Sequence, residues 1–258
     1  MPALTTASGA ANAVPVKDAA LLEVDHLASG YGDLRAVWDV SLSVAPGGIT
    51  LLVGRNGAGK STTLMAIAGL LPVHEGTIRY QGTDLTTMSV RDRVRGGVSF
   101  VPEGKRVFPS LTVEKNLLVS GGTLNRKSRK SKLAEVFLRF PLLAEHRARK
   151  ASALSGGQQQ VLAIAQALMG DTRLLLLDEP SAGLAPKIFA DVIGAVKQLA
   201  VEGVSVLLVE QVIDVALPAA DRVVLIDRGR NIYATDSPSG ATEKVIHDHL
   251  SASGSPRT

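Results

Sequence analysis

Residues 54–62 read Gly-Arg-Asn-Gly-Ala-Gly-Lys-Ser-Thr, a complete G-x-x-x-x-G-K-S phosphate loop. Glycines in this pattern free backbone N–H groups to surround phosphates at the start of a helix. Lys60 would supply a positive charge to the β and γ phosphates, and Ser61 a hydroxyl oxygen to Mg²⁺. The expected nucleotide-binding residues of the loop are Gly54, Arg55, Asn56, Gly57, Ala58, Gly59, Lys60, Ser61 and Thr62. Taken alone, the loop allows a kinase, a GTPase or a motor.

Two adjacent carboxylates, Asp178 and Glu179, follow the apolar run 174–177. A carboxylate at the end of an apolar strand lies at the carboxyl edge of the sheet, where open α/β folds bind their ligands. We expect Asp178 to hold Mg²⁺. We expect Glu179 to take a proton from the attacking water, a step worth roughly 10² to 10⁴ in rate. The pair therefore predicts nucleotide hydrolysis rather than binding alone.

The elements that must position these residues alternate between strands and helices. The apolar run 49–53 leads into the phosphate loop, and a helix is expected from Gly59-Lys60 to about Gly69. Further apolar runs at 174–177, 204–209 and 223–226, separated by helical patterns such as 187–199, predict a parallel sheet covered by helices. Alternating segments at 22–27 and 37–44 predict half-exposed antiparallel strands before it. The fold class is therefore α/β.

The sequence pattern changes between about 104 and 153, where residues 112–120 and 127–140 show the periodicity of helices. We interpret this stretch as a helical subdomain inserted into a core formed by 21–103 and 154–236. Residues 1–20 lack the features of a signal peptide and are interpreted as a disordered tail. Residues 237–258 are interpreted as a loop, a helix over 242–250 and a frayed tail.

Composition sets limits on the function. The 258 residues contain no cysteine, which excludes disulfides, thiolate metal sites and thiol nucleophiles. No run approaches the roughly 18 apolar residues of a membrane span. The net charge of +4 comes in part from Arg126, Lys127, Arg129, Lys130 and Lys132, which favour a solvated helix start or a surface near lipid headgroups. Nucleic acid is disfavoured because no aromatic residues alternate with these cations. The five histidines show no metal-ligand spacing, so Mg²⁺ arriving with the nucleotide is the only metal expected.

Three motifs together carry a family resemblance: 54–62, Leu154–Gln158 and Leu174–Pro180. Over residues 21–236 the chain resembles the ATP-binding subunit of ABC transporters, which implies an ABC-type P-loop ATPase domain with a mostly parallel sheet, an antiparallel β subdomain and an inserted helical subdomain. In that family the Ser-Gly-Gly-Gln stretch contacts ATP held by a partner subunit. The resemblance assigns this trans contact to Ser155, Gly156, Gly157 and Gln158. A hydroxyl and free amides at a helix start suit such an anion. The family's adenine-stacking aromatic falls on Tyr31, which could also be an ordinary turn residue.

Within the family, the segments 101–109, 178–186 and 209–211 are most similar to the smaller ATPase subunit of branched-chain amino acid importers. Three positions depart from the general family pattern. Glu103 stands in place of a Mg²⁺-contacting glutamine, Ala185 in place of an aspartate, and Gln211 in place of a catalytic histidine. Gln211 can donate a neutral hydrogen bond but no imidazolium charge. The resemblance therefore implies catalytic roles for Glu179 and Gln211, metal ligands at Ser61, Glu103 and Asp178, and modified rather than lost hydrolysis.

The resemblance also implies partners and a location. We expect two membrane permease subunits, a second ATP-binding subunit that is a copy or a paralogue, an extracytoplasmic solute-binding protein acting indirectly, and no nucleic acid. The expected location is the cytoplasmic face of the cell membrane, with docking through the groove near Glu103–Phe108. Importers of urea and short amides have similar ATPases, so the solute stays open. Alternatives are an exporter ATPase, a weakly hydrolysing regulatory subunit suggested by Gln211 and Glu103, and a non-transport ABC ATPase acting on nucleic acid or ribosomes.

Overall fold

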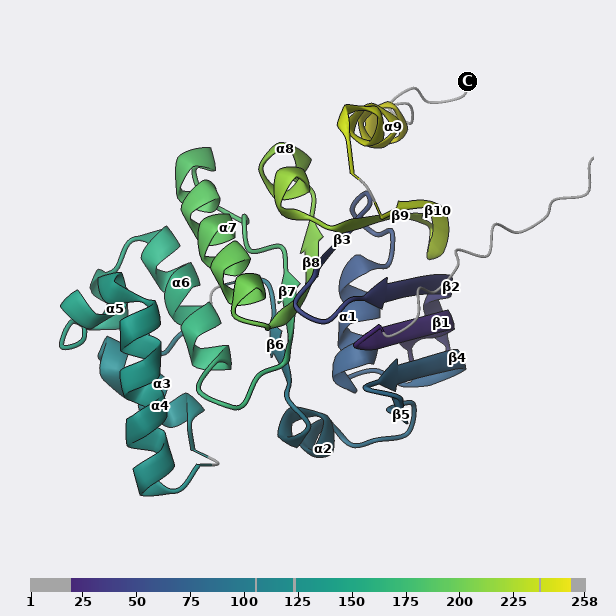
Figure 1. Ribbon diagram of the computed structural model, residues 1–258. Coiled ribbons are helices and arrows are strands. Elements are labelled where there is room, and N and C mark those ends of the chain that lie inside the picture. Colours follow the sequence, from purple (N-terminus) through teal and green to yellow (C-terminus); the bar gives the residue numbers. More distant parts are fainter. Residues whose placement is uncertain (1–19, 105, 123, 237, 252–258) are drawn as a thin grey trace, which may run out of the picture.

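A sheet of ten strands forms the centre of the molecule in a computed structural model that describes residues 20–104, 106–122, 124–236 and 238–251 (Figure 1). The strand order is β5-β4-β1-β2-β10-β9-β3-β8-β7-β6. The strands are β1 Leu22–Tyr31, β2 Leu34–Val44, β3 Ile49–Val53, β4 Val73–Tyr80, β5 Thr83–Asp84, β6 Val98–Val101, β7 Leu174–Asp178, β8 Ser205–Glu210, β9 Arg222–Asp227 and β10 Arg230–Thr235. The helices are α1 Lys60–Ala68, α2 Val90–Arg95, α3 Val113–Ser120, α4 Arg126–Arg139, α5 Pro141–Glu145, α6 Gly156–Ala167, α7 Pro186–Val201, α8 Ile213–Ala216 and α9 Gly240–Ser251.

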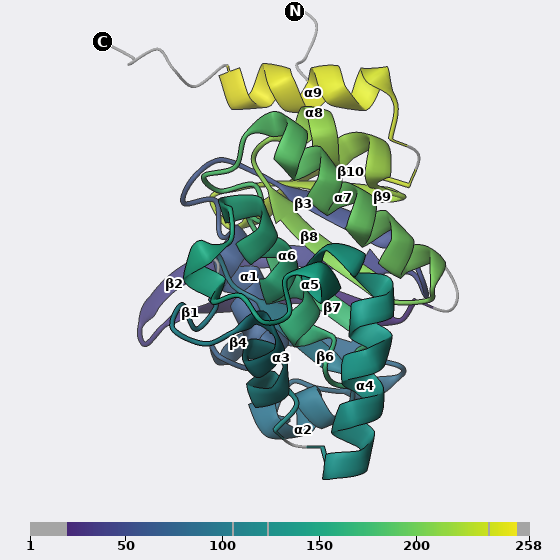
Figure 2. The ribbon, with the colours of Figure 1, turned by 90° about the vertical axis from the view of Figure 1, so that its left-hand side faces the viewer.

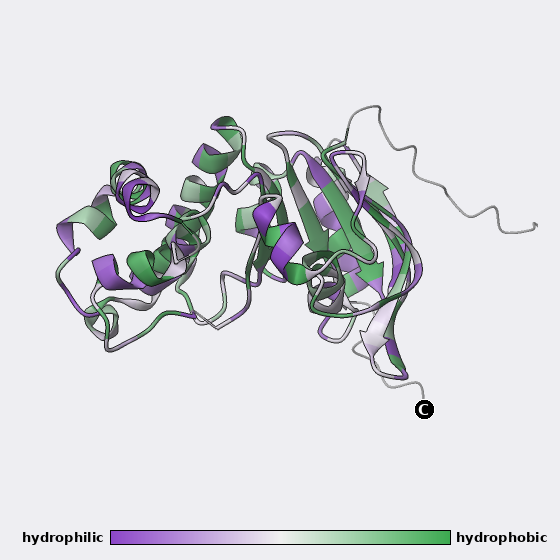
Figure 3. Cartoon of the chain, turned by 90° about the horizontal axis from the view of Figure 1, so that it is seen from below, coloured by the Kyte–Doolittle hydropathy of each residue, from purple (hydrophilic) through white to green (hydrophobic). Residues whose placement is uncertain are grey.

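The parallel half of the sheet contains β9, β3, β8, β7 and β6. Every residue of β3, β7 and β8 is buried, as expected for continuous apolar runs covered on both faces. Alternate residues face two different cores: Leu51 and Val53 pack with α6 and α7, whereas Leu52 packs with α1. In Figure 3 the strands in the middle of the molecule are mostly green, the colour of hydrophobic residues. The expected parallel sheet with helices on both faces is confirmed.

The antiparallel half contains β1, β2, β4 and β5, which curl over α1 (Figure 1). It joins the parallel half through β10, which pairs with β9 and meets β2 at a single position, Arg230 beside Asp39. The sequence analysis did not identify β10, β4, β5 or β6 as strands. β4 and β10 are only partly buried, β5 is exposed, and β6 has only four residues, so the apolar periodicity that reveals a strand is weak.

The helices α3, α4 and α5 lie between β6 and α6 in the chain and form a group at one side of the sheet (Figures 1 and 2). Their buried side chains Leu117, Val136 and Leu143 belong to the same hydrophobic core as Leu162 of α6. Two of these helices match the expected helices 112–120 and 127–140 to within a residue. The short α5, which begins at Pro141, was not expected.

The last helix, α9, lies across α8, at the end of the molecule opposite α2 (Figure 2). It begins two residues before the expected position 242 and buries Ile246 in the main core. Within the described residues, no helix has both the length and the apolar character that crossing a bilayer requires. Almost all of the expected tail 1–20, and the expected tail after Ser251, fall outside the described residues.

Candidate functional site

The phosphate loop connects β3 to α1, so the sheet fixes one end of the loop and the helix fixes the other. Gly59 precedes the first helical residue with φ of 103°, a left-handed conformation that glycine adopts at low cost. A Cβ on Gly59 would lie 3.0 Å from the carbonyl oxygen of Ala36 in β2. The loop is therefore packed against β2 directly before the start of α1, and the first N–H groups of a helix favour a bound phosphate.

The ammonium group of Lys60 is held by the loop itself. Nζ donates to the carbonyl oxygens of Gly54 at 2.9 Å and Arg55 at 3.1 Å, and the side chain is only 4% exposed. It also lies 3.3 Å from Oε1 of Glu179. The cation is thus placed in advance, and its carboxylate partner is the side chain that a phosphate would displace.

Asp178 ends β7 next to the loop, and its Oδ1 accepts a hydrogen bond from Ser61 Oγ at 3.0 Å. Burial raises the pKa of Asp178 to about 6, and the negative charges of Glu179 and Glu103 act in the same direction. The Ser61 hydrogen bond and the charge of Lys60 oppose this rise. A carboxylate oxygen and a hydroxyl oxygen at hydrogen-bond distance are ligands that suit Mg²⁺, and a dication would stabilise the ionised form of Asp178.

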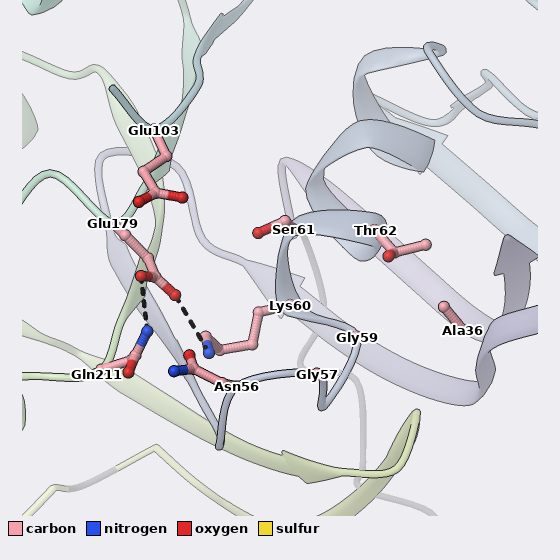
Figure 4. Close-up of a pocket in the computed structure, with 10 residues that line it drawn as sticks. All are labelled: Ala36, Asn56, Gly57, Gly59, Lys60, Ser61, Thr62, Glu103, Glu179 and Gln211. Atoms are coloured by element: carbon pink, nitrogen blue, oxygen red, sulfur yellow. Dashed lines mark hydrogen bonds and ion pairs between the residues drawn. The ribbon is translucent and has the colours of Figure 1, made fainter. Parts of the chain in front are cut away.

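Glu179 lies between two side chains, Lys60 at the start of α1 and Gln211 in the loop after β8 (Figure 4). Its Oε2 accepts a hydrogen bond of 2.7 Å from Nε2 of Gln211, and its other oxygen faces Lys60. The backbone of Glu179 has φ of 44°, and its N–H donates to the carbonyl oxygen of Val209 in β8. A non-glycine residue in this left-handed region is uncommon and is held there by its surroundings. The carboxylate is therefore aimed by both backbone and side-chain contacts.

A cavity of ≈ 460 Å³ joins these groups. The residues that line it are Ala36, Asn56, Gly57, Gly59, Lys60, Ser61, Thr62, Glu103, Glu179 and Gln211. Glu103, just after β6, faces the same space as Glu179 (Figure 4). The structure thus brings together the phosphate loop and the residues at the ends of β6, β7 and β8. Gly54, Arg55, Ala58 and Asp178 belong to the same neighbourhood but do not line the cavity.

The Ser155–Gln158 motif lies outside this cavity. Ser155 caps α6: its Oγ accepts from the N–H of Gln158 at 3.3 Å, and Gln158 Oε1 accepts from the N–H of Ser155 at 2.9 Å. The hydroxyl proton of Ser155 stays available because capping uses only a lone pair. A Cβ on Gly157 would lie 2.0 Å from Cγ2 of Ile188, so only glycine fits beneath α7.

Tyr31 also lies outside the lining of the cavity. It ends β1, is 52% exposed, and its hydroxyl lies 3.9 Å from the sulfur of Met65 in α1. The ring therefore has an accessible surface beside the helix that the phosphate loop starts.

Sequence analysis missed three residues of this region. Ala36 contributes to the cavity from β2, and nothing in its local sequence distinguishes it. Glu210 and Ser181 hold the loops after β8 and β7 together, with Oε1 of Glu210 accepting from the N–H of Ser181 at 2.8 Å. Glu210 could have been noticed in the sequence, because it is a carboxylate that directly follows the apolar run 204–209.

Among the described residues, one histidine belongs to a group of three possible metal ligands, although the sequence spacing suggested none. His247 Nε2 in α9 lies 3.3 Å from Asp214 Oδ1 in α8 and 3.9 Å from Glu243 Oε1. All three side chains are exposed. Ion pairing between two helices explains the cluster, and we assign it no metal.

The strand, phosphate loop, helix and pair of carboxylates define a P-loop nucleotide-binding α/β protein. Solved structures agree. The fold matches a nucleotide-free ATP-binding cassette from an ABC transporter with a TM-score of 0.82 and 26% identity, covering 91% of this chain and 98% of that one. It matches the ADP conformation of the cassette MJ1267 with a TM-score of 0.81 and 26% identity, covering 91% of this chain and 96% of that one.

The family follows from the sequence comparisons. The model of the ABC transporter family matches residues 37–182. The high-affinity branched-chain amino acid transport ATP-binding protein BraG of Pseudomonas aeruginosa is 41% identical, over 88% of this chain and 98% of its own. The lipopolysaccharide export ATP-binding protein LptB of Escherichia coli K12 is 32% identical, over 90% and 95%. The chain belongs to the ABC transporter family and is one of its ATP-hydrolysing subunits.

Proposed function

We propose that this chain powers an importer of branched-chain amino acids or related small polar solutes. The observation that carries this proposal is the likeness to BraG, at 41% identity over 98% of that protein. A second relative, the probable branched-chain amino acid transport ATP-binding protein LivF of Archaeoglobus fulgidus, is 36% identical over 89% of its length. The likeness to LptB at 32% keeps an exporter as the alternative.

In this proposal the phosphate loop binds ATP before any chemistry occurs. The amides of 56–61 surround the phosphates, and Lys60 exchanges its contact with Glu179 for the β and γ oxygens. Tyr31 stacks on the adenine from the exposed end of β1. Ser61, Asp178 and Glu103 supply oxygen ligands for Mg²⁺, which when bound neutralises charge that develops on the phosphates.

Release of Lys60 leaves Glu179 free to accept a proton from water. Gln211 already donates to Oε2 of Glu179, so it holds the carboxylate in one orientation while the other oxygen turns to the water. A neutral amide stabilises this arrangement without adding positive charge. Gln211 therefore acts as an orienting group where the general family pattern has a histidine.

The cavity supports a two-chain site, because none of Ser155, Gly156, Gly157 and Gln158 lines it. We infer that these residues contact ATP held by a second ATP-binding subunit, either a copy or a paralogue. The free hydroxyl proton of Ser155 and the first amides of α6 would meet the γ phosphate of that partner. Closure with ATP and reopening after hydrolysis would then change the orientation of two permease subunits.

We place the permease contact at the surface near Glu103–Phe108, on the cytoplasmic face of the membrane. Phe108 is 48% exposed, and Arg106 is exposed beside it. Charge reversal, Arg106→Glu, should reduce solute uptake strongly while ATP binding stays within about twofold, because the side chain does not line the nucleotide cavity. Uptake at the level of the unmodified transporter would contradict this docking surface.

The experiment that tests the function is purification of the tagged full chain from native membranes in mild detergent, followed by mass spectrometry. Two polytopic subunits, a second ATP-binding chain and a solute-binding protein that takes up amino acids or amides would support the proposal. Recovery with lipopolysaccharide-export partners would support the exporter instead. Recovery with ribosomes or nucleic acid and no membrane protein would overturn both.

A further inference from the structure

Glu210 is the last residue of β8, and its side chain is fully buried at 0% exposure. Three donors meet its carboxylate. Oε1 accepts from the N–H of Ser181 at 2.8 Å, and Oε2 accepts from Ser181 Oγ at 2.7 Å and from the N–H of Gln211 at 3.1 Å. Within the described part of the chain, no ion pair is made by this carboxylate. It is a buried anion that is compensated by hydrogen bonds alone.

The three donors belong to two loops that carry different parts of the site. Ser181 lies two residues after Glu179, in the loop that runs from β7 to α7. Gln211 begins the loop that runs from β8 to α8, and its side chain donates to Glu179. Glu210 therefore holds two backbone segments near Glu179. One is that of Ser181, two residues after Glu179, and the other is that of Gln211, whose side chain orients Glu179.

Burying a carboxylate is costly, and a neutral residue would end a buried strand at lower cost. Burial raises the pKa of Glu210, while the hydrogen bonds from Ser181 and Gln211 lower it. An anion in this place does one thing that a neutral amide cannot do, because its two oxygens accept from three donors at once. A carboxylate at this position can therefore accept hydrogen bonds from both loops at the same time.

We infer that Glu210 is a positioning residue for ATP hydrolysis, which joins the loops of Ser181 and Gln211 so that Gln211 keeps Glu179 in its reactive orientation. The inference rests on the proposed roles of Glu179 and Gln211. It makes Glu210 part of the hydrolytic step and leaves ATP binding to the phosphate loop, because the hydrogen bonds of the Glu210 side chain within the described residues go to Ser181 and Gln211.

The first test is Glu210→Gln in the full chain, with MgATP turnover measured over a range of ATP concentrations. The amide keeps the shape but turns one acceptor into a donor that faces the existing donors. We expect kcat to fall on the order of tenfold to a hundredfold, as for a small misplacement of a reacting group. KM for ATP should stay within about twofold. Glu135→Gln, the same chemical change on the exposed face of α4, is the matched control and should leave both constants unchanged.

The decisive measurement combines this change with Gln211→Ala. If Glu210 acts through the side chain of Gln211, Gln211→Ala removes the group through which it acts. Glu210→Gln should then lower kcat by less than about twofold in the Gln211→Ala background. A fall in kcat that is as large with Gln211→Ala as without it would overturn the inference. So would a Glu210→Gln chain that keeps its kcat.

Ser181→Ala keeps the proposal testable if Glu210→Gln does not fold. It removes one of the three hydrogen bonds and leaves the anion in place, so kcat should fall roughly two- to tenfold, the range that matches the net worth of one hydrogen bond. Ser181→Thr restores a hydroxyl and should recover most of the loss. Unchanged turnover in Ser181→Ala would count against the inference.

Glu179→Gln, measured in parallel, separates this inference from the proposed function. If Glu179→Gln abolishes hydrolysis and Glu210→Gln has no effect, only the positioning role fails. If Glu179→Gln still hydrolyses ATP, the proposed base is wrong and the positioning role fails with it.

Discussion

The loop after β3 and the loops after β7 and β8 meet in one cavity, but they are built in different ways. The phosphate loop is held by contacts to backbone atoms: the Lys60 side chain donates to the carbonyl oxygens of Gly54 and Arg55, and the loop packs on the backbone of β2 at Gly59. The loops after β7 and β8 are joined to each other mainly through side chains, because Gln211 bonds to Glu179 and Glu210 bonds to both loops. One backbone bond, from the N–H of Glu179 to the carbonyl oxygen of Val209, adds to these contacts.

This difference separates two tasks. A backbone cradle is complete before the ligand arrives and can bind phosphate without help from distant residues. The carboxylate of Glu179 is held by the side chains of Gln211 and Lys60, and such contacts can be exchanged. In the proposed mechanism Glu179 must give up its contact with Lys60. Binding should therefore fail when the phosphate loop is changed, and turnover should fail alone when the carboxylate network is changed.

The largest expected effect comes from Glu179→Gln. Loss of the general base should lower kcat by roughly 10² to 10⁴, while ATP affinity stays within a few-fold because the phosphate loop is intact. Single-turnover hydrolysis and equilibrium ATP binding on the same preparation measure the two quantities. An equal loss of ATP affinity would contradict the separation of binding from turnover, because it would make Glu179 part of the group that binds ATP.

Lys60→Ala should give the opposite result. The substitution removes the cation from the loop, and the loss of hydrogen bonds to a charged phosphate lowers ATP affinity by roughly tenfold to a hundredfold. Glu179 also loses its ion-pair partner and keeps its hydrogen bond from Gln211. Titration with a fluorescent ATP analogue measures the affinity. Unchanged affinity with low kcat would place Lys60 in the hydrolytic group instead.

Asp178 ends β7 and accepts a hydrogen bond from Ser61, so it connects the two regions. The pH dependence of protein stability can test the ionisation of its side chain. Its pKa is raised to about 6 by burial, so the folded chain without nucleotide binds this proton more tightly than the unfolded chain does. The ionised form therefore costs stability, and this cost grows as the pH rises from about 4 to about 6. Asp178→Asn should raise the free energy of unfolding on the order of 3 kcal/mol at pH 7.5, and by only about a third of that at pH 4.5, which lies between the two pKa values.

The same substitution should remove the Mg²⁺ dependence of ATP binding, because it removes an anionic ligand. Denaturant unfolding at the two pH values, and ATP titration with and without Mg²⁺, test both statements. An equal stability gain at both pH values would show that ionisation of Asp178 is not the cause.

The contrast also explains how much of the site could be predicted. The phosphate loop is continuous in sequence, so its spacing, together with the apolar run 49–53 before it, predicted the strand, the loop and the start of α1. The fold class followed from the buried runs 49–53, 174–177, 204–209 and 223–226. The roles of Glu210 and Ser181 could not be read in this way, because their contact joins loops from two strands. β10 was missed because one side of it is exposed and its pairing with β2 is a single contact.

The smallest predicted effect concerns Tyr31, which lies on the antiparallel half and outside the cavity lining. Base stacking on an aromatic ring contributes about 1–3 kcal/mol, and the half-exposed position favours the lower end, or about fivefold in affinity on Tyr31→Ala. Tyr31→Trp should keep ATP affinity, since a larger ring stacks at least as well. Comparison of ATP with inorganic triphosphate sharpens the test, because triphosphate has no base and should bind equally to both variants. A loss that is equal for ATP and triphosphate would show that Tyr31 supports α1 through Met65 rather than contacting the nucleotide.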